Sequence, residues 1–158
     1  MSVEIEPVAQ PPEVMVFGRQ FEDVPSGSAT LLVVDDDQAV RVVVRRLLQR
    51  YGYVVLEAES GAAALRLLRD AAVPIDLVLT DVVMPGMSGV EFVQQMKTEF
   101  PAIPAVYISG HLDEPAVQDG TRGAEQWVLA KPLSLAMLVA TVRDSLDHKA
   151  QREQYRTL

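Results

Sequence analysis

From Thr30 onward, short apolar runs alternate five times with stretches of helical periodicity, and this alternation restricts the fold more than any other feature. Such alternation is typical of consecutive βαβ units, whose strands lie side by side in a parallel sheet. The continuous apolar runs suit strands that helices cover on both faces. We expect strands at 31–34, 53–57, 76–80, 105–109 and 127–130. The predicted fold class is α/β, with a doubly wound, five-stranded parallel sheet and five helices.

The first two expected helices have recognisable ends. Asp37 is a good N-cap for the first helix, and Gly52 ends it. The helical spacing places five apolar residues on one face of this helix: Val40, Val44, Leu47, Leu48 and Tyr51. The second helix begins at Ser60 and ends before Pro74, because the residue before a proline is biased away from helix.

The remaining three helices differ in how clearly they are marked. Ser88 and Glu91 form a capping box for the third helix. We expect that helix to bury Val90, Val93 and Met96. The stretch 112–122 contains a proline and a glycine, so the fourth helix is poorly marked. The fifth begins near Ser134.

Two polar extensions flank this domain. Residues 1–29 are rich in proline and acidic side chains, which indicates a flexible leader or linker. The domain itself is expected over 30–147. Residues 148–158 form a polar C-terminal tail, which either frays or extends the last helix.

Charge and composition exclude several classes of function. Lys and Arg number 14 against 22 Asp and Glu, a net charge of −8, and such a surface repels nucleic acid. There is no cysteine, so disulfides, thiol nucleophiles and zinc–thiolate sites are excluded. The N-terminus lacks the basic and apolar regions of an export signal, and no apolar run approaches the length of a membrane span. We expect a soluble, cytoplasmic protein.

Acidic residues follow two of the predicted strands. Asp35, Asp36 and Asp37 come at the end of the first strand, and Asp81 comes at the end of the third. In a doubly wound sheet, ligands bind outside the carboxyl ends of the strands, so these carboxylates converge. Their mutual repulsion and hard oxygen atoms favour a divalent cation, and Mg²⁺ suits a site that phosphate oxygens complete.

Two further groups come at the ends of the fourth and fifth strands. Ser109 supplies a hydroxyl donor, and Lys131 supplies an ammonium group that can pair with an anion. Acid, metal, hydroxyl and lysine are together the parts of phosphoryl transfer to a carboxylate.

The chain resembles the receiver domain of two-component response regulators, in particular the single-domain, chemotaxis-regulator-like members. The resemblance covers about residues 30–147. It is carried by LLVVDDD (31–37), LVLTDVVMPGMSG (77–89), VYISG (106–110) and LAKPL (129–133). It implies a flavodoxin-like fold.

The same resemblance assigns roles to residues. Asp81 becomes the phosphoacceptor, and Asp35 and Asp36 become metal-site acids. Mg²⁺ is then bound with Asp81 and the carbonyl of Val83. Ser109 becomes the switch hydroxyl, and Lys131 becomes the lysine of the family motif.

The resemblance also implies partners. The phosphoryl group comes from a sensor histidine kinase or a histidine phosphotransfer protein. The signal passes to a downstream protein through the face formed by the fourth helix, the fifth strand and the fifth helix, and a phosphorylation-dependent dimer is left open. The chain is then a signalling module rather than an enzyme, with only self-catalysed phosphotransfer and autodephosphorylation.

The chain departs from the family pattern at two places. An aromatic residue usually stands three residues before the lysine, where this chain has Val128, with Trp127 one residue earlier. Ser109 stands where threonine is common and lacks the methyl group that restrains the rotamer. His111, next to this hydroxyl, is a hypothetical tuner of dephosphorylation.

Several alternatives stay open. Asp37 serves as an N-cap rather than a metal ligand, and Asp35 binds the metal either directly or through water. A second function is a phosphatase of the haloacid dehalogenase type, because residues 35–37 satisfy an Asp-x-Asp signature. Residue 39 is alanine and no acidic pair follows Lys131 on a loop, and both features oppose it. A nucleotide-binding module would need a glycine-rich phosphate loop. The chain could also be a receiver separated from a hybrid kinase.

Overall fold

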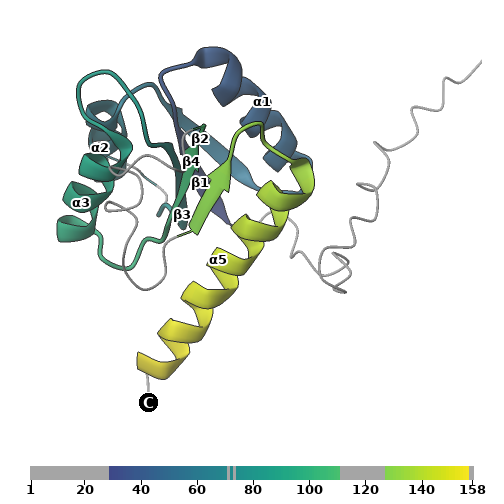
Figure 1. Ribbon diagram of the computed structural model, residues 1–158. Coiled ribbons are helices and arrows are strands. Elements are labelled where there is room, and N and C mark those ends of the chain that lie inside the picture. The colour runs from purple at the N-terminus through teal and green to yellow at the C-terminus, as the bar shows by residue number, and fades with distance from the viewer. Residues whose placement is uncertain (1–28, 71, 73, 111–126, 157–158) are drawn as a thin grey trace, which may run out of the picture.

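The computed structural model describes residues 29–70, 72, 74–110 and 127–156. It shows a parallel sheet of five strands in the order β2-β1-β3-β4-β5, with helices on both faces (Figure 1). The strands are β1 (Thr30–Val34), β2 (Val54–Ala58), β3 (Leu77–Asp81), β4 (Ala105–Ser109) and β5 (Trp127–Ala130). The helices are α1 (Gln38–Gln49), α2 (Gly61–Asp70), α3 (Gly89–Glu99) and α5 (Leu135–Arg156). The predicted α/β fold class is confirmed.

The predicted elements match the observed ones closely. β4 and β5 have the predicted bounds, and the other three strands differ by one residue. The described ranges contain four helices, and the expected fourth helix at 112–122 lies outside the described residues. The expected leader and His111 also lie outside them, apart from residue 29.

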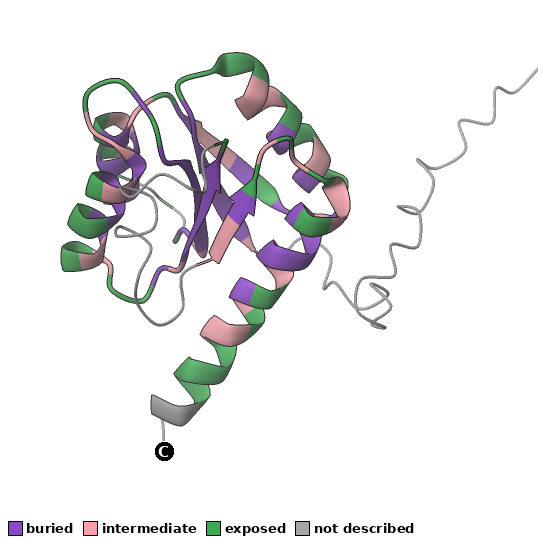
Figure 2. Ribbon diagram, viewed as in Figure 1, coloured by how far each residue is buried: buried purple, intermediate pink, exposed green. Residues whose placement is uncertain are grey.

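Two apolar cores lie on opposite faces of the sheet. α2 and α3 cover one face, with Leu32, Val34 and Phe92 in that core. α1 and α5 cover the other, with Leu31 and Val33 in the second core. Side chains of a strand alternate between faces, so β1 serves both cores. β1, β3 and β4 are buried throughout (Figure 2), which explains why their sequences are continuous apolar runs.

The predicted helix caps are present. The Asp37 carboxylate accepts hydrogen bonds from the N–H groups of Ala39 (2.9 Å) and Val40 (3.4 Å) at the start of α1. The Ser88 hydroxyl accepts one from the Glu91 N–H (3.1 Å) at the start of α3. These bonds satisfy N–H groups that have no partner within their helix.

The buried face of α3 differs from the prediction at one position. Phe92, Val93 and Met96 are buried, whereas Val90 is only partly buried. The buried residues of α3 are Gly89, Phe92, Val93 and Met96, and their spacings of three and four residues place them on one helix face. Val90 still packs against the same core, and Phe92 is the fully buried residue that the prediction omitted.

Helix α5 continues through the polar tail to Arg156, so the tail extends the last helix. The Lys149 ammonium lies 3.6 Å from Oδ1 of Asp76, and Oδ2 of that carboxylate accepts the Thr30 N–H at 2.8 Å. These contacts connect α5 to the start of β1. Beyond them, residues 150–154 are exposed (Figure 2). Among the described residues, no helix has both the length and the apolar character needed to cross a bilayer.

Candidate functional site

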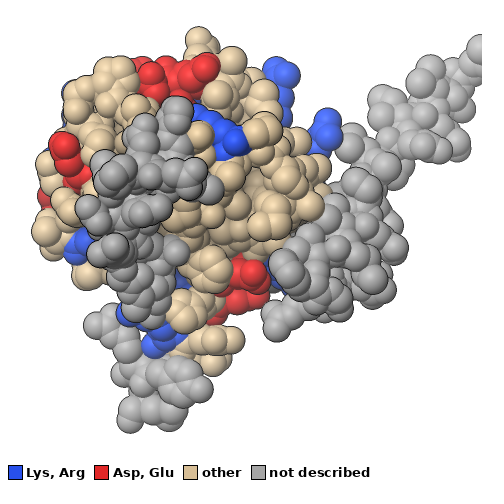
Figure 3. Space-filling view, in the orientation of Figure 1, with Lys and Arg blue, Asp and Glu red and all other residues tan. Residues whose placement is uncertain are grey.

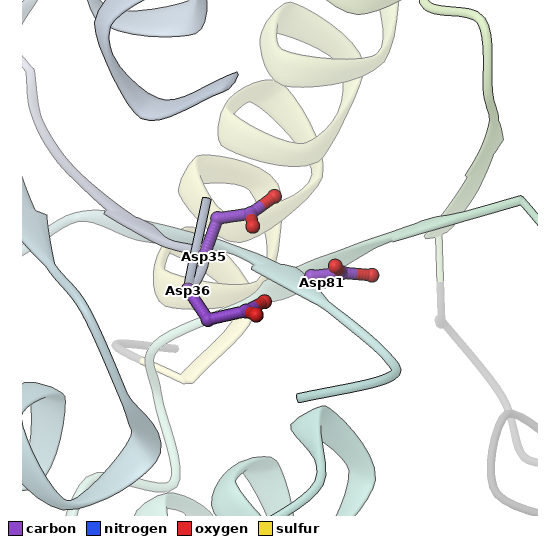
Figure 4. Close-up of side chains that lie close together, drawn as sticks. All are labelled: Asp35, Asp36 and Asp81. Carbon is purple, nitrogen blue, oxygen red and sulfur yellow. The ribbon is translucent and has the colours of Figure 1, made fainter. Parts of the chain in front are cut away.

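Three carboxylates meet at the carboxyl ends of β1 and β3. The register pairs Val34 with Thr80, so the residues that follow, Asp35 and Asp81, come out at the same edge of the sheet. Asp35, Asp36 and Asp81 each offer an oxygen atom within 4.8 Å of the others. Figure 4 shows the three side chains lying together, two from the end of β1 and one from the end of β3. The predicted convergence of these acids is therefore present.

Asp35 is held at three points. Its residue is 2% exposed, and its N–H donates to the carbonyl of Ala58 on β2 (3.2 Å). Its Oδ1 accepts the N–H of Asp37 (2.9 Å), and its carbonyl accepts a hydrogen bond from Nη1 of Arg41 (2.6 Å). The turn that carries Asp35 and Asp36 is thus fixed by bonds to β2, to α1 and within itself.

Lys131 reaches the acids from the end of β5. Its ammonium nitrogen lies 3.2 Å from Oδ2 of Asp81 and 3.8 Å from Oδ2 of Asp35. Its backbone N–H donates to the carbonyl of Ser109 at 2.9 Å, which aligns the ends of β5 and β4. The ammonium group is therefore placed beside the carboxylate that the sequence assigns as phosphoacceptor.

Ser109 ends β4, the strand next to β3. The register pairs Asp81 with Ile108, so Ser109 comes one residue beyond that pair at the same edge of the sheet. The residue is 1% exposed. The predicted hydroxyl thus belongs to the same edge as the acids.

The negative charge of the cluster exceeds its positive charge. Burial raises the pKa of the Asp35 carboxyl, and the nearby carboxylates of Asp81 and Asp36 raise it further. The Asp37 N–H and the Lys131 ammonium act in the opposite direction. Figure 3 shows acidic side chains gathered at the end of the molecule toward which the strands point. A bound cation would relieve this repulsion.

The donor set fits Mg²⁺. This ion prefers oxygen ligands at about 2.1 Å, so two direct ligands lie at most about 4.2 Å apart. The three carboxylate oxygens, all within 4.8 Å of one another, are close enough together for the acids to share one such ion. The carboxylate of Asp37 is instead engaged in capping α1, as predicted.

Val83 follows Asp81 closely in the loop between β3 and α3. Its N–H donates to Oδ1 of Asp81 (3.4 Å), and its residue is 56% exposed. The assignment of its carbonyl as a metal ligand stays a prediction.

The same loop depends on two glycines. Gly86 has φ +77°, a backbone conformation that residues other than glycine rarely adopt. Gly89, the first residue of α3, lies against the end of β3. A Cβ at Gly89 would collide with the carbonyl oxygen of Asp81 and lie 2.9 Å from its carbonyl carbon. Residue 89 must therefore be glycine for α3 to begin where it does.

Two contacts to the site were not predicted from the sequence. Arg41 binds the carbonyl of Asp35, and the buried Thr80 hydroxyl donates to the carbonyl of Asp81 at 2.9 Å. From the sequence, an arginine on an amphipathic helix is expected to face solvent. A threonine within an apolar strand is expected to pack in the core. Neither residue carries a local signal that would separate it from those ordinary roles.

Val128, at the position where the family usually has an aromatic residue, and the neighbouring Trp127 lie on opposite faces of β5. Trp127 packs against the core beneath α1 and α5, and Val128 packs against the core beneath α2 and α3. Trp127 pairs with Val106 at the start of β5, three residues before the strand's end at Ala130. The residue that occupies the usual aromatic position is thus aliphatic and contacts the α2–α3 side.

Comparison with known proteins gives a consistent picture. The family described as response regulator receiver domain matches residues 31–143. Over 122 residues the chain is 38% identical to the sensor kinase CckA of Brucella abortus (strain 2308), covering 77% of this chain and 13% of that protein. It is 35% identical over 122 residues to the transcriptional regulatory protein FixJ of Azorhizobium caulinodans, covering 76% of this chain and 56% of that protein. The chain thus spans only part of the length of these curated relatives.

Solved structures show the same similarity. The receiver domain from the hybrid histidine kinase CckA has a TM-score of 0.64 and 33% identity, covering 75% of this chain and 99% of that one. The chemotaxis protein CheY4 of Vibrio cholerae has a TM-score of 0.68 and 31% identity, covering 76% of this chain and 100% of that one.

Proposed function

The chain belongs to the response regulator receiver domain family, and from that premise we propose that it is a cytoplasmic phosphoacceptor that takes a phosphoryl group onto Asp81. The observation that carries the proposal is the arrangement around Asp81. One of its oxygens lies 3.2 Å from the Lys131 ammonium, and Asp35 and Asp36 each offer a carboxylate oxygen within 4.8 Å of an Asp81 oxygen. A nucleophilic carboxylate that lies beside both a cation-binding pair of acids and an ammonium group suits phosphoryl transfer.

The donor in this proposal is a phosphohistidine of a sensor histidine kinase or of a histidine phosphotransfer protein. A carboxylate oxygen of Asp81 forms a bond to phosphorus while the bond from phosphorus to the imidazole nitrogen breaks. The electron pair of the broken bond leaves with the imidazole, so the products are an acyl phosphate and a free histidine. Little covalent work falls to the protein, because positioning and charge neutralisation dominate this barrier.

Mg²⁺, bound by Asp35 directly or through water together with Asp36, Asp81 and the Val83 carbonyl, would neutralise charge on the transferring phosphoryl oxygens. The residues of the chain supply the other stabilising contacts. Lys131 pairs with a phosphoryl oxygen. The Val83 N–H, which donates to Asp81 Oδ1, orients the nucleophilic carboxylate.

The output of the proposed reaction is a conformational change. The acyl phosphate offers new acceptor oxygens near the end of β4, where the Ser109 hydroxyl is positioned to donate. Ser109 and Lys131 are linked by a backbone hydrogen bond of 2.9 Å, so a movement at β4 is transmitted to β5. We propose that the signal reaches a downstream protein through the face that includes β5 and α5. The fourth-helix part of that face lies outside the described residues.

The relatives suggest two arrangements for such a module. One relative is a sensor kinase and another is a transcriptional regulatory protein, and the chain covers a minor part of the first and about half of the second. This chain would act either by contact with a separate partner or as the receiver portion of a larger kinase. A dimer that forms on phosphorylation is compatible with both.

The family assignment does not favour the phosphatase alternative, and turnover distinguishes the two functions. Incubated with Mg²⁺ and acetyl phosphate, the chain should acquire about one base-labile phosphoryl group per molecule, detected by intact-protein mass spectrometry. A chelator should prevent the labelling, because the acids then repel the phosphodonor. Many cycles of hydrolysis of a generic phosphate ester would support the phosphatase and contradict the proposal.

Two neighbouring acids provide a matched comparison for the metal site. Asp36→Asn removes a carboxylate from the cluster, and the Mg²⁺ concentration that gives half-maximal labelling should rise about tenfold or more. Asp37→Asn removes the same charge one residue later but keeps a good helix cap. The Mg²⁺ concentration that this variant needs for half-maximal labelling should therefore stay near that of the wild type. Equal requirements in the two variants would remove Asp36 from the metal site.

Lys131→Ala should bind Mg²⁺ yet fail to switch. The substitution removes a positive charge that lies beside Asp81 and Asp35 and repels Mg²⁺. Binding of Mg²⁺ should therefore be kept or strengthened. The phosphoryl group, however, loses the contact that connects it to β5. Trp127 is the single tryptophan and lies on the same strand, so its fluorescence should change on phosphorylation of the wild type and not of the variant.

Lys97→Ala is the control for this measurement. Lys97 donates to the carbonyl of Ile103 (2.6 Å), before the start of β4, and has no part in the acidic cluster. Its variant should keep the fluorescence change. If Lys131→Ala gave the wild-type change at equal phosphorylation, Lys131 would not transmit the signal.

A further inference from the structure

A hydrogen bond and two ion pairs connect the turn from Asp35 to Asp37 with α1 and β2. Nη1 of Arg41 donates to the carbonyl of Asp35 at 2.6 Å, and Nε of the same guanidinium lies 3.4 Å from Oε1 of Glu57. The Arg41 side chain is only 13% exposed. A guanidinium with donors in two directions thus bridges a backbone carbonyl and a carboxylate.

Glu57 is itself fixed. It lies on β2 opposite Val33 of β1, and its Oε2 accepts a hydrogen bond of 2.6 Å from Nη1 of Arg45, one helical turn after Arg41. The Glu57 side chain is 22% exposed. The carboxylate therefore anchors both arginines, but only Arg41 reaches the turn from Asp35 to Asp37.

We propose that Arg41, anchored by Glu57, is a positioning residue that fixes the turn from Asp35 to Asp37 so that the Asp35 and Asp36 carboxylates face Asp81. The inference rests on the proposed function. Arg41 contacts no reacting atom, and its effect passes through the backbone of Asp35. The N–H of Asp35 donates to the carbonyl of Ala58 on β2, and the carbonyl of Asp35 accepts from Arg41. Without the arginine, the peptide group that joins Asp35 to Asp36 loses this hydrogen bond.

The charge of Arg41 and its positioning of the turn have opposite effects on the binding of Mg²⁺. The positioning role can therefore be tested separately from the charge. The positive charge of Arg41 repels Mg²⁺, so if charge were its only influence, its removal would tighten binding. Lysine keeps that charge, but one ammonium group cannot reproduce two donors pointing to different acceptors. Arg41→Lys therefore removes the positioning while leaving the electrostatics close to those of the wild type.

The test is the affinity of the full chain for Mg²⁺ alone, measured by isothermal titration calorimetry. We expect Arg41→Lys to weaken binding about tenfold, the usual size for a residue that orients a metal ligand. Arg45→Ala loses a contact to the same Glu57 without touching the turn, and its affinity should stay within about twofold of the wild type. Wild-type affinity in a folded Arg41→Lys protein would overturn the proposal.

A second readout needs no metal. The Asp37 N–H donates to Asp35 Oδ1 within the fixed turn, so its hydrogen exchange should be faster in metal-free Arg41→Lys than in wild type or Arg45→Ala. Unchanged exchange would also count against the proposal. If the wild type binds no Mg²⁺, the proposed function fails at its metal site, while the exchange rate still decides the role of Arg41. If Arg41→Lys does not fold, Glu57→Gln, which weakens the anchor, takes its place in both measurements.

Discussion

Asp81→Asn is expected to remove all Mg²⁺-dependent labelling by acetyl phosphate while the protein stays folded. The amide keeps the shape of the side chain but lacks the nucleophilic oxygen that forms the acyl phosphate. Asp81 is 8% exposed and lies among acids, so the substitution relieves repulsion with Asp35 and Asp36 as it loses the Lys131 ion pair. These opposing effects should keep the change in unfolding free energy to about 1 kcal/mol.

Mass spectrometry of the intact protein measures the labelling, and circular dichroism measures whether the protein stays folded. Asp144→Asn makes the same chemical change at an exposed position on α5 and should label like the wild type. Stoichiometric labelling of folded Asp81→Asn would show that another residue accepts the phosphoryl group. The proposed function would then lose its central residue.

Gly89→Ala is expected to produce the largest loss of stability among the substitutions considered. The new methyl group would collide with the Asp81 carbonyl oxygen and lie 3.0 Å from Cα of Val82, and both are backbone atoms that cannot rotate away. Either α3 or the end of β3 must shift. Overpacking a rigid site costs about 1–3 kcal/mol and sometimes more, and a backbone collision belongs at the upper end of that range.

The melting temperature should fall by roughly 10 °C, because about 1 kcal/mol corresponds to several degrees in a domain of this size. Labelling of Asp81 should also slow, since the strain falls on its own carbonyl. Gly110→Ala is the matched control: a Cβ there meets no heavy atom of the described residues within 4 Å, so stability should change by about 0.5 kcal/mol or less. A Gly89→Ala protein that melts and labels like the control would show that the contact yields easily.

The sequence alone was sufficient for much of the fold because the relevant signals are local. Apolar runs and helix caps involve neighbouring residues, so strands were predicted to within one residue and Asp37 and Ser88 were recognised as caps. The acids at the ends of β1 and β3 were predicted to meet because parallel strands share a carboxyl edge. The motif resemblance then assigned the phosphoacceptor.

What the sequence could not supply depends on pairs of distant residues. Lys131 was expected at a strand end facing the acids, but it lies 50 positions from Asp81, and the particular contact between the two depends on the order β2-β1-β3-β4-β5 and its register. Arg41 and Glu57 meet because α1 packs on β2, and each looks like a solvated charge when read alone. The full burial of Phe92, which the prediction omitted, has the same origin, because it depends on how α3 packs against the rest of the core.

The sequence by itself thus determined which side chains stand at the ends of the strands, because periodicity and turn chemistry are properties of adjacent residues. Only the tertiary structure decided how those side chains are held: Arg41 on the Asp35 carbonyl, Lys131 between two carboxylates and Gly89 against Asp81. Contacts of this kind depend on distances of a few ångströms between separate elements. The packing of the whole sheet and its helices sets those distances, and no local pattern encodes them.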